Sequence, residues 1–117
     1  MGIDLITDEL APEKLVAAAK RLTDIRARWL ARKKPEATRK IIVTALSHLP
    51  ADMPEFAGKT DVSAFIEQVQ YDTILSLRNS ELAVGITLDG TSFSRWQWVT
   101  ERAIGEIVAL VVQSYLA

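Results

Sequence analysis

The sequence predicts a mainly α-helical fold of three to four helices packed around a long apolar helix at the C-terminal end. Apolar side chains recur at three- and four-residue spacing along most of the chain, which is the pattern of amphipathic helices. Prolines, glycines and an Asp-Gly pair separate these periodic segments. Of the 117 residues, 49% are hydrophobic, so one core is sufficient. We expect a single domain over residues 1–117.

The first predicted helix runs from Pro12 to about Arg32. Proline suits the first helical position, and Glu13 complements the positive end of the helix dipole. Pro35 ends the helix, because the residue before a proline is pushed away from helical geometry. The expected inner face consists of apolar side chains at helical spacing: Leu15, Ala18, Ala19, Leu22, Ile25 and Trp29.

A second helix is predicted from Pro35 to about Leu49, with the same Pro-Glu opening. The short link between the two helices predicts a hairpin. Pro50, Pro54 and Gly58 then mark a loop of about ten residues. The inner face of the second helix is expected to contain Thr38, Ile41, Ile42, Ala45, Leu46 and Leu49.

Helical and strand periodicities compete in residues 60–80. Val69, Thr73 and Leu77 fall on one helical stripe, but residues 69–77 also alternate as a strand would. We favour a helix that ends near Leu77. Residues 82–88 are short and rich in β-forming residues, so they form a possible β element whose partner is either 69–77 or another subunit.

The last predicted helix runs from Phe93 or Ser94 to Tyr115 and has two apolar sides. A helix that is apolar nearly all round is normally buried on more than one side. Gly105 and Ala109 would allow another backbone to approach closely. We therefore predict a second seam that serves as an interface: Trp98, Gly105, Ala109, Val112 and Leu116.

Charge is unevenly distributed along the chain. Residues 20–40 hold nine basic and two acidic side chains (+7), whereas the remainder holds five basic and thirteen acidic ones (−8). This asymmetry favours an anionic partner or self-association. A sequence pI near 5.8 favours a solvated face or an acidic protein over nucleic acid. Candidate anion- or nucleic-acid-binding residues are Arg21, Arg28, Arg32, Lys33, Lys34, Arg39 and Lys40.

No motif in the sequence predicts catalysis. The chain has no cysteine and a single histidine, His48, so a histidine-dependent triad or a cysteine-ligated zinc site is excluded within one chain. We expect His48 to be structural and Glu101 to pair with an arginine. No catalytic residue, metal or cofactor is predicted. The acidic N-terminal segment and the short apolar runs predict a soluble, cytoplasmic protein with no membrane partner.

We therefore expect a non-catalytic assembly, adaptor or regulatory protein that acts through a protein–protein interface, with itself or another protein as partner, as a homo-oligomer. The first alternative is a nucleic-acid-binding regulator that uses the basic segment 20–40. The second alternative is a small enzyme with a pocket between helices, in which Glu101, Tyr71 or His48 would supply polar groups.

Overall fold

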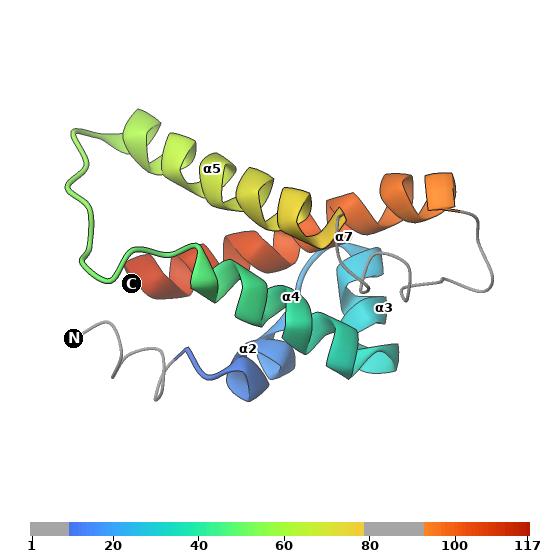
Figure 1. Cartoon of the computed structure of the whole chain (residues 1–117). Helices are drawn as coiled ribbons and strands as arrows, with labels where there is room; N and C mark the ends of the chain where they lie inside the picture. Colours follow the sequence, from blue (N-terminus) through green and yellow to red (C-terminus); the bar gives the residue numbers. More distant parts are fainter. Residues whose placement is uncertain (1–9, 79–92) are drawn as a thin grey trace.

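The computed structural model describes residues 10–78 and the helix Phe93–Leu116, whose side chains are described from Glu101 onward (Figure 1). The described residues form five helices and no strand, so the prediction of a mainly helical fold is confirmed. The helices are α2 (Pro12–Ala19), α3 (Ile25–Lys33), α4 (Pro35–Ser47), α5 (Lys59–Arg78) and α7 (Phe93–Leu116).

Residues 69–77 are helical, and the alternative of a strand there is wrong. Val69, Thr73 and Leu77 are all buried, and their four-residue spacing places them on one side of α5. Burial therefore follows the helical period and not the period of two. The possible β element at 82–88 lies outside the described residues. No helix in the described ranges is long and apolar enough to cross a lipid bilayer.

The single helix predicted from Pro12 to Arg32 is wrong, because the chain turns between α2 and α3. Asp24 is the N-cap of α3, and its Oδ1 accepts hydrogen bonds from the backbone N–H groups of Arg26 (2.7 Å) and Ala27 (3.2 Å). Such a cap satisfies donors that a helix start leaves without partners. Ile25, expected on an inner face, is instead 71% exposed.

A carboxylate from α7 binds this same turn. Glu106 accepts hydrogen bonds from the backbone N–H groups of Thr23 (2.8 Å) and Asp24 (2.9 Å) and from the Thr23 hydroxyl (3.1 Å). These bonds to an ionised acceptor are stronger than bonds between neutral groups. Glu106 therefore ties the start of α3 to α7, although the bonded residues are more than 80 positions apart in sequence.

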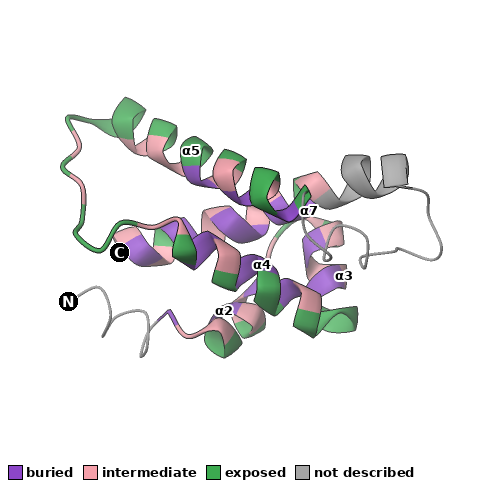
Figure 2. Cartoon of the chain, viewed as in Figure 1, coloured by how far each residue is buried: buried purple, intermediate pink, exposed green. Residues whose placement is uncertain are grey.

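The core lies where α7 meets the other helices. α7 contacts α3, α4 and α5 extensively and α2 more sparsely, and Figure 2 shows buried residues along the middle of α4 and α7. Fully burying one large aliphatic side chain contributes about 1.5–3 kcal/mol. The fully buried side chains of α7 are Ala103, Ile104, Ile107, Val108, Val111 and Val112, and they face Leu30, Ile41, Ile42 and Ala45 in one apolar cluster.

Tyr115, near the end of α7, holds the loop between α4 and α5. Its hydroxyl donates a hydrogen bond to the Pro50 carbonyl oxygen (2.8 Å). Its ring stacks on Phe65 of α5 at 6.2 Å between centroids, and Phe65 meets Phe56 of the loop edge-on at 5.5 Å. Burial raises the pKa of Tyr115, and the negative charge of Asp52 raises it further. The loop is thus attached to the core at both Pro50 and Phe56.

Replacing Glu106 with glutamine should lower the free energy of unfolding by about 1–3 kcal/mol, because the amide loses the charge and one of the two acceptor oxygens that bind the turn. The measurement is urea denaturation followed by circular dichroism. Gln113→Ala, at an exposed position of the same helix, is the matched control and should change stability by less than about 0.5 kcal/mol. Equal stabilities for Glu106→Gln and wild type would show that the contact has no net effect.

Tyr115 should make stability fall in alkali. Its pKa is raised in the folded protein. The contribution of this pKa shift to the free energy of unfolding is therefore complete below the unfolded-state pKa of about 10. Above that pH the unfolded state loses its proton first, and the contribution is lost as the pH rises through the folded pKa. Thermal unfolding between pH 8 and 11 should show a smaller decline for Tyr115→Phe than for wild type. A decline in Tyr115→Phe as large as that of wild type would contradict this assignment.

Candidate functional site

The cations of the basic segment do not form one surface. Because the chain turns at residues 20–24, Arg21 lies before the start of α3, whereas Arg32, Lys33 and Lys34 lie at its end. A nine-residue helix is about 14 Å long, so these cations do not lie along one long helix as the predicted Pro12–Arg32 helix would have placed them. Arg28 is only half-buried on α3.

The exposed cations gather at the turn from α3 to α4. Arg32, Lys33 and Lys34 are exposed there, and Lys40 is exposed one turn into α4. None of these four makes an ion pair with a described residue, in contrast to Arg26, Arg39 and Arg78. Arg32 and Lys33 stand in the last turn of α3, where cations complement the helix dipole. The charged groups of Arg32 and Lys33 still face solvent, so an anionic partner can reach them.

Arg39, another candidate, is bound by Glu13. The distance from its Nε to the Glu13 Oε1 is 3.1 Å, and both side chains are exposed. The pKa of Glu13 lies below its usual value because its carboxylate accepts a hydrogen bond from its own backbone N–H and, to a lesser extent, from Arg39. Arg39 therefore joins α4 to α2 and adds less free charge than its neighbours.

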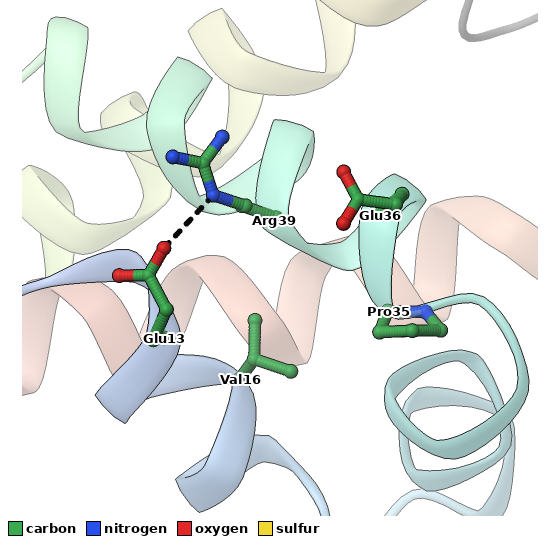
Figure 3. A pocket seen from close by; sticks show the side chains of 5 residues that line it. All are labelled: Glu13, Val16, Pro35, Glu36 and Arg39. Atoms are coloured by element: carbon green, nitrogen blue, oxygen red, sulfur yellow. Dashed lines mark hydrogen bonds and ion pairs between the residues drawn. The ribbon is translucent and has the colours of Figure 1, made fainter.

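A pocket of about 230 Å³ lies beside this ion pair, between α2 and the start of α4 (Figure 3). Two carboxylates and one guanidinium are its only charged groups, and none of its lining residues is a serine, threonine, cysteine, lysine or histidine. It is lined by Glu13, Val16, Pro35, Glu36 and Arg39. Glu101, Tyr71 and His48, the polar groups expected in a small enzyme, do not line this pocket.

Those three residues are in other places. Glu101 binds Arg78, with 2.6 Å between its Oε1 and the arginine Nε, which confirms the expected pairing with an arginine. His48, at the C-cap of α4, shares a hydrogen bond of 3.0 Å with the Ser76 hydroxyl. Tyr71 is exposed on α5. The described residues contain no group of three side chains able to hold a metal ion.

The predicted second seam of α7 is partly covered by the same chain. Val112 is fully buried, whereas Gly105, Ala109 and Leu116 are half-buried. The Gln70 side chain of α5 donates a hydrogen bond to the Gly105 carbonyl oxygen (2.8 Å). The side chain of Trp98 lies outside the described residues. Among the described members of the seam, only the half-buried Gly105, Ala109 and Leu116 are therefore left for another subunit.

Sequence reasoning missed two outward faces that the fold leaves open. On α5, Tyr71 and Leu75 are one turn apart and 59% and 42% exposed. On α4, Val43 is 43% exposed between Lys40 and Ser47. A 100° projection of each helix could have found them, because they lie opposite the buried stripes.

No family model, no curated protein and no solved structure matches this chain.

Replacing Gly105 with alanine should stabilise the protein by up to about 1 kcal/mol, because alanine is the better helix former. No backbone lies within 4 Å of the added methyl group, whose nearest neighbour is the Gln70 amide nitrogen at an ordinary 3.8 Å. The close approach of another backbone that was predicted at this glycine does not occur within the described part of the chain. Urea denaturation measures the change, and a loss of stability would indicate a close contact with a second subunit.

Proposed function

We propose that this protein is a non-catalytic assembly, adaptor or regulatory protein that acts through protein–protein contacts as a homo-oligomer. Another copy of the chain, or another protein, is the partner. The cytoplasmic location expected from the sequence stays part of this proposal.

The outward face of α5 is the observation that carries this proposal. Tyr71 and Leu75 stand on the side of the helix opposite the buried Val69, Thr73 and Leu77, and the exposed Ala64 and Gln68 continue the same face. An aromatic and an aliphatic side chain one turn apart offer one continuous apolar contact to a partner. Tyrosine is also enriched among the residues that dominate interface energies.

The chemistry of the described residues supports a binding role over an enzymatic one. Glu101 and His48 are each engaged in a separate side-chain contact. In the pocket beside Arg39, the Glu13 carboxylate is paired with that arginine, and no hydroxyl, thiol or imidazole lines the pocket. A general acid–base pair would need two such groups within reach of one substrate.

A nucleic-acid-binding regulator is the second candidate, and it is favoured by the exposed cations at the α3–α4 turn, which make no ion pair with a described residue. The outward face of α4 that follows the turn carries Glu36 and Val43 as well as Lys40, which does not resemble a helix that reads bases. Trp29, the only aromatic residue within the segment 20–40, is half-buried and packs against the core.

The first test is self-association of the full chain at about 150 mM salt, where contacts between exposed charges are largely screened. Wild type should form an oligomer in sedimentation velocity, and Tyr71→Ser should weaken it about tenfold or more, the effect expected from losing an interface hot spot. Ile25→Ser removes a side chain that is also exposed but lies on α3, and it should associate like wild type. A strict monomer at every concentration would overturn the proposed function.

A further inference from the structure

We propose that two copies of this chain join side by side and antiparallel along the outward faces of α4. In this arrangement the basic end of each copy (Arg32, Lys33 and Lys34) meets the acidic end of the other (Asp52, Glu55 and Asp61). The inference supplies one interface of the proposed assembly, and so it rests on the proposed function.

The basic end directly precedes α4. Its three cations are exposed and make no ion pair with a described residue, and only Glu36 offsets them locally. Such charges keep their hydration until a partner provides an opposite charge. They are therefore available for an intermolecular contact.

The acidic end follows α4. Asp52 and Glu55 are exposed in the loop, and Asp61 is exposed at the start of α5. The Asp61 Oδ2 accepts a hydrogen bond from the Ala57 N–H (3.0 Å), which fixes the carboxylate to the loop, and the loop is itself attached to Tyr115 through Pro50. Lys59 is the only cation in residues 52–61, so the acidic end keeps a net negative charge.

The two ends are held apart by α4. A helix of 13 residues spans about 20 Å, and in Figure 1 the α3–α4 turn and the loop after α4 lie at opposite ends of this helix. Glu36, Lys40, Val43 and Ser47 are exposed and share one side of α4, because their spacing is that of a helical face.

Val43 stands at the centre of this arrangement. It lies on the exposed side of α4, between the basic end that precedes the helix and the loop with Asp52 and Glu55 that follows it. A two-fold axis at Val43 therefore places the basic end of each copy near the acidic end of the other, twice in one interface. The exposed Val43 side chains of the two copies would meet on the axis, in a contact that is apolar and self-complementary, as a two-fold interface requires.

A second copy fits these charges better than a polyanion does. A phosphate backbone would attract the basic end but repel the acidic end, whereas a second copy provides an opposite charge for each end. A parallel arrangement would bring like charges together, so the charge pattern also selects the antiparallel orientation.

The first experiment exchanges the charges in the full chain. Lys33→Glu with Lys34→Glu, and separately Asp52→Lys with Glu55→Lys, should each weaken association at about 20 mM salt by about tenfold or more, because each places like charges opposite one another. Mixing the two double variants should restore association, since all facing charges are then opposite. Lys20→Glu with Arg21→Glu makes the same charge change at exposed positions outside the interface and should leave association unchanged.

The second experiment tests the position of the axis. The chain has no cysteine, so Val43→Cys carries a single thiol. Helices that pack 8–10 Å apart place facing side chains within disulfide range. Mild oxidation should convert Val43→Cys into a covalent dimer, and Ile25→Cys, exposed on α3, should stay monomeric under denaturing conditions.

The outcomes separate this inference from the proposed function. Equal cross-linking of the two cysteine variants, or no recovery in the mixture of charge variants, overturns the antiparallel dimer, while oligomerisation that depends on Tyr71 would still support the proposed function. A wild type that stays monomeric at every salt concentration overturns both. Binding of duplex DNA that is lost in Lys33→Glu with Lys34→Glu, without self-association, would assign the basic end to a polyanion and also overturn the dimer.

Discussion

The contact of Glu106 with the turn before α3 is the interaction on which the arrangement of the other helices depends. Glu106 is the one acidic side chain among the largely apolar residues 103–112 of α7, and a half-buried carboxylate is costly unless donors surround it. Thr23 and Asp24 supply these donors from their backbone and one hydroxyl. The bonds determine where α3 begins, and α3 in turn positions the turn into α4.

The buried face of α4 determines which of its residues remain outside. Ile41, Ile42 and Ala45 are completely buried, and α4 contacts α2, α3, α5 and α7, so only the side with Lys40 and Val43 is open. The buried Thr38 fits this environment because its hydroxyl donates to the Lys34 carbonyl oxygen (3.1 Å). No comparable partner exists for the buried hydroxyl of Thr73 among the described residues. The outward face is therefore a direct consequence of how the core is filled.

Local patterns in the sequence were sufficient for α4, α5 and α7 but not for the break between α2 and α3. The helical stripe of α5 and the Pro-Glu start of α4 are properties of neighbouring residues, which periodicity detects. Residues 20–24 contain no proline or glycine, and lysine, arginine and leucine favour helices. The turn depends on Glu106, which lies 82 residues beyond Asp24. No local rule can detect that contact, and the only local signal of the break is Asp24, a residue type that favours helix N-caps. A helix that continues past residue 24 places Ile25 on its inner face.

The charge asymmetry is visible in the sequence, but the positions of these charges relative to one another follow only from the fold. Counting charges shows a basic segment and an acidic remainder, and it does not show that some of these charges stand at the two ends of one helix. In a molecule whose principal extents are 43 × 26 × 25 Å, opposite charges at the ends of α4 favour one relative orientation of two copies. Exposed ion pairs contribute little individually, so they select an orientation more effectively than they hold copies together. The apolar faces at Val43 and Tyr71 are where the remaining binding free energy would arise, because burial of apolar surface is only weakly affected by the screening that weakens ion pairs.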